Sequence, residues 1–190
     1  MSRRTYLIGE TVAFRKTTLP FGGLSNMAPG YPLVINGYAI RSSEALYQIC
    51  RFPEYPTIQK QIIFEKSPMI AKRVSQKELS KTREDWDLIR FKVMRWCLEV
   101  KLFQNWDKFS LLLESTGTKY IVEATPTDKV WGAVLKGDNY EGINALGRLL
   151  MEIREKYIFN KEIPPIICPP EVANFKIFNE IILPIPTSRI

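Results

Sequence analysis

The chain has 190 residues, of which 45% are hydrophobic and 25% are charged, and this length and composition are typical of one globular domain rather than two. Its 27 lysines and arginines exceed its 20 aspartates and glutamates, so the formal net charge of +7 favours polyanionic partners such as nucleic acid or phosphate-bearing ligands. The chain contains no histidine, which excludes a Ser-His-Asp or Cys-His triad and any histidine-ligated metal. Acid–base chemistry near neutral pH therefore falls to carboxylates, lysine, tyrosine or bound water.

The amino-terminal third is expected to contain short strands, turns and a first helix. Residues 12–14 and 33–35 are candidate strands, and the Asn36-Gly37 pair that follows the second is a hairpin signal. A helix is predicted over residues 43–52, because Ser42 or Ser43 can cap it and apolar residues recur along one face. Two further helices follow, one near residues 58–63 and one that starts at Ser67-Pro68.

The longest predicted helix covers residues 83–104, where apolar residues recur at intervals of three and four. A shorter helix is expected over residues 106–115 and a strand over residues 120–122. Residues 124–143 are predicted to form a long polar loop, and residues 144–157 form the last strong amphipathic helix. The sequence therefore predicts several helices with short strands between them.

The carboxyl-terminal segment is rich in proline and carries one strand-like run at residues 175–183. We expect residues 1–160 to form a single compact domain, and residues 161–190 to form an extended strap packed on that same domain.

The three cysteines, Cys50, Cys97 and Cys168, are far apart and form no C-x-x-C pair, so we expect free buried thiols rather than disulfides or a zinc site. No apolar run approaches the ~20 residues that cross a bilayer, and residues 1–10 contain no hydrophobic signal core. The sequence thus predicts a cytoplasmic protein that needs no metal and no cofactor.

Three regions are candidates for chemistry. One of them, Arg15-Lys16 with Leu24-Ser25-Asn26, is by itself a turn with polar residues. Glu44 lies in the first turn of a predicted helix, where it either acts on a substrate or is only stabilised by the helix dipole, by ~0.3–1 kcal/mol. In the segment 123–147, Asn144 is expected to cap a helix whose N-terminus could bind phosphate, and Trp131 either stacks on a base or only packs.

Five blocks of residues, in order from about residue 12 to residue 157, resemble the NADAR family (NAD- and ADP-ribose-associated domains). The resemblance is carried by Leu24-Ser25-Asn26, by Ser43-Glu44 with Tyr47-Gln48 and Arg51-Phe52, by Ser67-Pro68-Met69 with Ala71-Lys72-Arg73, by Trp86, Met94 and Lys101, and by Glu123, Asp128, Trp131-Gly132, Gly142, Asn144, Leu146-Gly147, Leu150-Met151 and Arg154.

The resemblance implies a compact, mainly helical α+β domain that hydrolyses N-glycosidic bonds to ribose. YbiA-like members cleave riboflavin-pathway intermediates. Others remove ADP-ribose from guanine in nucleic acid, as antitoxins beside DarT-type ADP-ribosyltransferases. The local sequence motifs of this chain resemble those of this second group more closely. By resemblance, Glu44 and Asp128 are the catalytic candidates. The candidates for substrate binding are Lys16, Ser25, Asn26, Trp86, Glu123, Trp131, Gly132 and Asn144.

The sequence departs from the family pattern around these blocks. Ala45 stands where a histidine often follows the motif glutamate, and Val74-Ser75 stands where glycine-arginine is common. Val134 replaces a second glycine after Trp131-Gly132. Such changes could alter the substrate, or leave a module that binds ADP-ribose or NAD without turnover. A nucleic-acid-binding domain without a pocket is a further alternative.

Overall fold

The computed structural model describes residues 1–187. These residues form two compact units, each assembled from segments that are distant in sequence. Unit 1 contains Met1–Ser25 and Trp106–Ile163, and unit 2 contains Asn26–Asn105 and the described residues from Pro164 onward. The predicted fold class, α+β and mainly helical with short strands, is confirmed. The division into residues 1–160 and 161–190 stays a prediction. Within residues 1–187, no helix is both long enough and apolar enough to cross a membrane.

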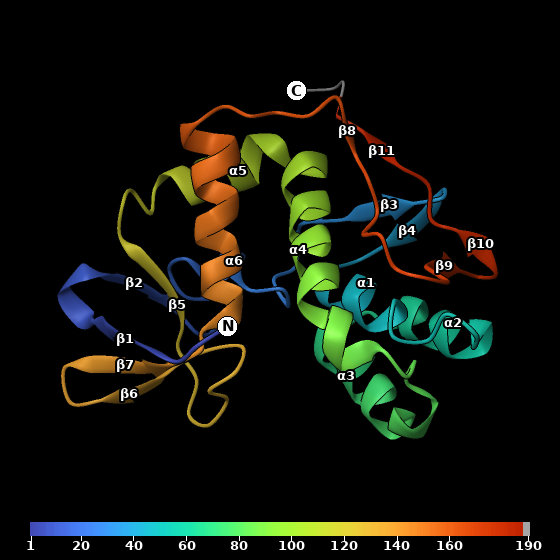
Figure 1. Cartoon of the computed structure of the whole chain (residues 1–190), viewed down its shortest axis with the longest axis horizontal. Coiled ribbons are helices and arrows are strands. Elements are labelled where there is room, and N and C mark those ends of the chain that lie inside the picture. The colour runs from blue at the N-terminus through green and yellow to red at the C-terminus, as the bar shows by residue number, and fades with distance from the viewer. Residues whose placement is uncertain (188–190) are drawn as a thin grey trace. The chain divides into compact units, whose positions relative to one another are not determined.

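Unit 1 places two small sheets beside helices. Its antiparallel sheet has the order β1-β7-β6, and its parallel pair joins β2 to β5 with Val12 opposite Ile121. Helix α6 packs on β5 (Figure 1), because the leucines and Ile153 on one face of α6 are buried. The elements of this unit are β1 (Arg4–Leu7), η1 (Ile8–Glu10), β2 (Thr11–Phe14), η2 (Gly22–Leu24), α5 (Trp106–Glu114), β5 (Tyr120–Glu123), β6 (Val134–Lys136), β7 (Asn139–Gly142), α6 (Ala145–Ile153) and the π-helical η4 (Arg154–Phe159).

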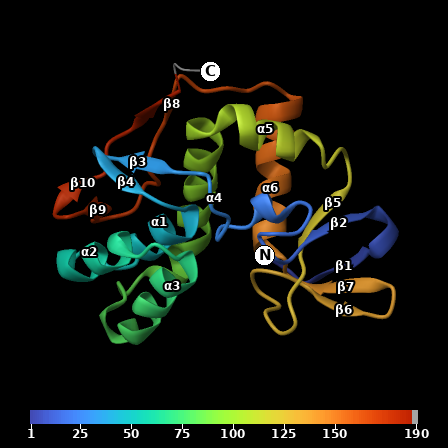
Figure 2. The ribbon, with the colours of Figure 1, turned by 180° about the vertical axis from the view of Figure 1, so that it is seen from behind.

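Unit 2 is built around α1, which contacts three other helices of the unit. The hairpin β3–β4 and the carboxyl-terminal strands lie on the same side of α4 (Figure 2). Its elements are β3 (Leu33–Ile35), β4 (Tyr38–Ile40), α1 (Ser43–Ile49), α2 (Pro56–Phe64), α3 (Pro68–Lys77), η3 (Leu79–Lys81), α4 (Trp86–Gln104), β8 (Ile166–Ile167), β9 (Lys176–Ile177), β10 (Glu180–Ile181) and β11 (Ile185–Pro186).

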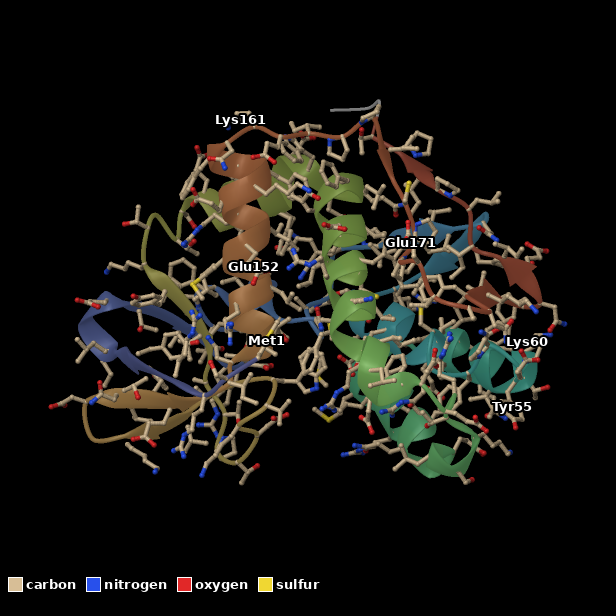
Figure 3. The ribbon with its side chains drawn as sticks, viewed as in Figure 1. Met1, Tyr55, Lys60, Glu152, Lys161 and Glu171 are labelled. Atoms are coloured by element: carbon tan, nitrogen blue, oxygen red, sulfur yellow. The ribbon has the colours of Figure 1, made fainter. Side chains whose placement is uncertain are left out.

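The carboxyl-terminal segment is fastened to unit 2 by side chains that bridge backbone groups. Gln59 of α2 donates to the carbonyl of Lys176 (3.0 Å) and accepts from the amide of Phe178 (2.7 Å). Trp96 of α4 packs edge-to-face on Phe175, with 5.2 Å between ring centroids. Glu171, in the same segment, lines a small cavity together with residues of α4, and its position is labelled in Figure 3.

Three local predictions are wrong. The run 175–183 is not one strand but the pair β9–β10, because Phe178 and Asn179 adopt positive φ angles and reverse the chain. The segment 124–143 is not all loop, since it contains the hairpin β6–β7. Cys168 is exposed rather than buried, whereas the other two cysteines are buried as expected.

Candidate functional site

Glu44 is a buried carboxylate, with 6% of its surface exposed. It lies in the first turn of α1, where the Ser42 hydroxyl accepts a hydrogen bond from the amide of Ala45 (3.2 Å) and caps the helix. An acid that served only the helix dipole could remain in water, whereas burial of an ionised carboxylate is costly unless hydrogen bonds compensate it. The surroundings of Glu44 must therefore supply donors.

One donor comes from the next turn of the same helix. The side-chain nitrogen of Gln48 donates to Glu44 Oε1 (2.8 Å), and the hydroxyl of Ser75 on α3 donates to the side-chain oxygen of Gln48 (2.5 Å). Arg51 donates in turn to the Ser75 hydroxyl at 3.4 Å. The spacing of Glu44 and Gln48, four residues apart on a helix, is the one sequence signal that could have predicted this contact.

Asn26 contacts the start of the same helix. Its carbonyl accepts from the amide of Glu44 (3.2 Å), and its side-chain oxygen accepts from the Ser43 hydroxyl (3.1 Å). The side-chain nitrogen of Asn26 donates to the sulfur of Met94 at 2.7 Å. The structure thus brings two predicted site residues together, and these contacts use the polar atoms of Asn26.

Aromatic rings and a guanidinium lie in the same part of unit 2. The ring of Trp86 lies 4.8 Å from that of Tyr47, and the Arg51 guanidinium lies 5.0 Å from the Trp86 centroid. Burial raises the pKa of Tyr47 and lowers that of Arg51, while the neighbouring Tyr47 and Glu44 raise the pKa of Arg51. Trp86 is 4% exposed, so its stacking capacity is already used mainly by protein groups.

In unit 1, Asp128 organises a turn. Its Oδ1 accepts from the amides of Val130 (2.8 Å) and Trp131 (2.9 Å), and the Asp128 amide donates to the Thr125 hydroxyl (2.7 Å). Asp128 is exposed and Trp131 is half-buried. Oδ1 of Asp128 therefore has a structural role, and its proposed catalytic role stays a prediction.

Asn144 joins the start of α6 to strand β5. It occupies the N-cap position as predicted, but its side chain makes no capping hydrogen bond. Instead it donates to the carbonyl of Ile121 (2.8 Å) and accepts from the amide of Glu123 (3.1 Å). The amides of Ala145 and Leu146 donate to loop carbonyls at 2.9 and 3.0 Å, so these helix N-terminal donors serve the fold rather than a free phosphate site.

Gly132 is required by close backbone packing, because a Cβ at this position would collide with the side chain of Thr125 and the carbonyl of Glu123. Lys16 is exposed, and its carbonyl accepts from the amide of Leu19 (3.2 Å). Ser25 is 7% exposed and follows η2. The roles of these residues in substrate binding stay predictions.

The predicted residues fall into two groups when each unit is taken by itself. Unit 2 joins Asn26 and Glu44 directly and packs the ring of Trp86 on Tyr47 of the same helix as Glu44, and unit 1 joins Glu123 and Asn144 directly. Among residues 1–187, no cluster of acidic residues and cysteines could hold a metal ion. Sequence reasoning assigned no part in the chemistry to Gln48, Arg51 or Ser75. The spacing of Gln48 on α1 could have shown its contact with Glu44, but only the packing of α1 against α3 brings Ser75 to Gln48.

Residues 13–157 match the model of the NADAR domain. The chain belongs to the NADAR domain family. The N-glycosidase YbiA of Shigella boydii is 33% identical over 160 residues, which cover 84% of this chain and 96% of that protein. The maize protein named riboflavin biosynthesis protein PYRR, chloroplastic, is 32% identical over 160 residues, which cover 77% of this chain but 25% of that protein.

A solved structure agrees with the family assignment. The NMR structure of Escherichia coli YbiA is similar with a TM-score of 0.68 at 30% identity, covering 81% of this chain and 88% of that one. The predicted family resemblance is therefore confirmed, and curated relatives in the family carry the name N-glycosidase.

Proposed function

We propose that this NADAR protein is an N-glycosidase in which Glu44 assists cleavage of the bond between ribose and a nitrogen base. The observation that carries the proposal is the buried Glu44 carboxylate, which is held by Gln48 at 2.8 Å in a chain that is 33% identical to a named N-glycosidase. A carboxylate can stabilise the positive charge that develops on the sugar during such a reaction.

The reaction breaks the bond from the anomeric carbon to nitrogen, and the electron pair leaves with the nitrogen, which gains a proton. The sugar becomes oxocarbenium-like, and water adds its oxygen to the anomeric carbon while giving up a proton. Glu44 stabilises the positive charge and accepts the proton of water. Asp128, in unit 1, stays a predicted contact for water or for the ribose hydroxyls.

The remaining predicted residues hold the other parts of the substrate. In this proposal Trp86 and Trp131 line the base or the adenine. The exposed Lys16 is the candidate for a phosphate contact, whereas the side chains of Asn26 and Asn144 already make hydrogen bonds within the protein. Ser25, Glu123 and Gly132 stay predicted substrate-binding residues.

For the substrate, we propose ADP-ribose attached to guanine in nucleic acid, as in antitoxin-type reversal of a DarT-type modification. The net charge of +7 supports a polyanionic substrate. Helix α3, in the same unit as Glu44, carries Lys72, Arg73 and Lys77 and no acidic residue, and the last two cations are exposed. These cations can neutralise phosphates of a nucleic acid.

A second candidate substrate class is favoured by the comparisons. YbiA of Shigella boydii is named an N-glycosidase, and the maize relative is named a riboflavin biosynthesis protein. A YbiA-like hydrolase of riboflavin-pathway intermediates is therefore the alternative function. The second alternative is a protein that binds ADP-ribose or NAD without turnover.

Offering both substrate classes to one preparation tests the proposal. Release of ADP-ribose from guanine-modified DNA, with no cleavage of riboflavin-pathway intermediates, is the expected result. The reverse pattern would overturn the proposed substrate but leave the proposed reaction. Calorimetric binding of ADP-ribose with no turnover of either substrate would refute the proposal that the protein is an enzyme.

The α3 face provides a separate test of the nucleic-acid component. The double variant Arg73→Glu/Lys77→Glu should weaken DNA binding and reduce the slope of log affinity against log salt by about 2. The double variant Lys156→Glu/Lys161→Glu in unit 1 changes the net charge equally and is the control. Equal loss in both variants would show that total charge, rather than α3, attracts the nucleic acid.

A further inference from the structure

We propose that Arg51, Ser75 and Gln48 form a directional hydrogen-bond relay that positions the carboxylate of Glu44. The inference rests on the proposed function, since it gives the relay a reaction to serve. These three are positioning residues, because they act on the substrate through Glu44.

The direction of the relay follows from the chemistry of its members. Arginine can only donate, so the Ser75 hydroxyl accepts from Arg51 Nη1 (3.4 Å) and directs its own hydrogen to Gln48 Oε1 (2.5 Å). With its oxygen engaged, Gln48 must turn its amino group to Glu44 Oε1 (2.8 Å). Every donor therefore faces Glu44, and the last acceptor is a carboxylate oxygen.

The first member of the relay is itself held in place. The Arg51 guanidinium lies 5.0 Å from the centre of the Trp86 ring, and that ring packs at 4.8 Å on Tyr47 of α1. Burial lowers the pKa of Arg51, but an arginine stays charged at neutral pH. The Arg51 guanidinium thus stands at the donor end and the Glu44 carboxyl group at the acceptor end, with two neutral groups between them.

The relay is protected from water. Ser75 is 0% exposed and Gln48 is 4% exposed, so solvent does not compete for their hydrogen bonds. Hydrogen bonds in such surroundings are stronger and polarise one another. Ser75 reaches Gln48 because α3 turns its buried face, which includes Ala71, towards α1.

Ser75 supplies the hydroxyl that links Arg51 to Gln48. Removing its hydroxyl leaves the Gln48 amide free to rotate, and Glu44 loses its fixed orientation. Small displacements of catalytic groups cost up to ~100-fold in rate. We therefore expect Ser75→Ala to lower kcat roughly 10- to 100-fold with little change in KM.

The matched control removes another buried hydroxyl that accepts from an arginine. Thr116 accepts from Arg154 Nη1 at 2.7 Å in unit 1. Thr116→Val should lower stability about as much as Ser75→Ala and leave kcat unchanged. Ser75→Thr keeps the hydroxyl and should restore most of the activity, which a purely structural role of Ser75 would not require.

Two readouts separate the relay from the proposed function. The first is kcat of wild type, Ser75→Ala and Ser75→Thr on guanine-ADP-ribosylated DNA and on riboflavin-pathway intermediates. The second is the NMR signal of the Gln48 side-chain amide, which should shift and exchange faster with water in Ser75→Ala but not in Thr116→Val.

If wild type turns over a substrate and Ser75→Ala keeps full kcat, the relay is overturned while the function stands. If no substrate is cleaved but the Gln48 signal responds as expected, the hydrogen-bonded relay stands and the proposed function fails. An unchanged Gln48 signal in Ser75→Ala overturns the relay whatever the activity.

Discussion

Replacing Asn144 with alanine should strongly destabilise the protein, although Asn144 was expected to serve a substrate. Its buried side chain bridges the carbonyl of Ile121 and the amide of Glu123, and its backbone adopts a left-handed conformation with φ of 52°. Alanine would leave two backbone groups without their side-chain partner and would also disfavour the left-handed backbone.

The cost can be worked out group by group. A buried polar group left unsatisfied costs about 1–3 kcal/mol, and alanine meets the left-handed cost of about 1–2 kcal/mol that asparagine offsets in part through local hydrogen bonds. With partial relaxation, Asn144→Ala should lose about 3–5 kcal/mol. Asn144→Gly accepts the left-handed backbone, so it should recover roughly 1 kcal/mol of that loss.

The chain offers a matched control in Asn36. It also has a left-handed backbone, with φ of 49°, and its side chain also bridges two backbone groups, the carbonyl of Ile181 (2.8 Å) and the amide of Leu183 (3.1 Å). These bonds are exposed, so water can replace them. Asn36→Ala should therefore cost only about 1–2 kcal/mol.

Equilibrium urea unfolding, followed by circular dichroism, measures both variants. A loss in Asn144→Ala that is two or more times the loss in Asn36→Ala supports the reasoning. Equal losses would refute it, because burial would then have no part in the effect. Near-normal stability of Asn144→Ala, together with weaker substrate binding, would favour the ligand role instead.

Three further predictions concern stability and reactivity. Gly147→Ala should lower the free energy of unfolding in urea by about 2–3 kcal/mol, because the added Cβ collides with the carbonyl of Ile121. A gain in stability, as alanine usually gives in place of glycine within a helix, would contradict this. In the native state iodoacetamide should modify one thiol, at the exposed Cys168, and mass spectrometry of Cys168→Ser should find none. The hydrogen bond from Arg83 lowers the pKa of Asp85, so the stabilisation that Asp85 gives to the fold is present above its unfolded pKa and is lost as pH falls below about 4. The urea midpoint of Asp85→Asn should therefore fall less than that of wild type between pH 5 and pH 3.

The sequence predicted the elements whose signals are local. Helix α4 was expected from apolar residues at intervals of three and four, and α6 from its leucine-rich face. Strand β1 was not predicted, because it pairs with a partner about 135 residues away, as in Tyr6 opposite Tyr140. Pairing between distant segments leaves little trace in the alternation of a four-residue strand.

The candidate site shows the same division. Glu44 could be predicted from its motif and its place in the first turn of a helix, and the structure adds that it is buried. Ser75 could not be predicted, since its role depends on the packing of α3 against α1. The structural use of Asn144 was also hidden, because a helix cap and a bridge to a neighbouring strand require the same residue type.

The most direct test of the proposed function compares wild type and Glu44→Gln on guanine-ADP-ribosylated DNA. Glutamine keeps the shape of the side chain and removes its charge. We predict release of ADP-ribose by wild type, a loss of ~10²–10⁴-fold in turnover in the variant, and an unchanged far-UV spectrum. Turnover near that of wild type in a folded Glu44→Gln protein would contradict the account, because the buried carboxylate would then have no part in the chemistry.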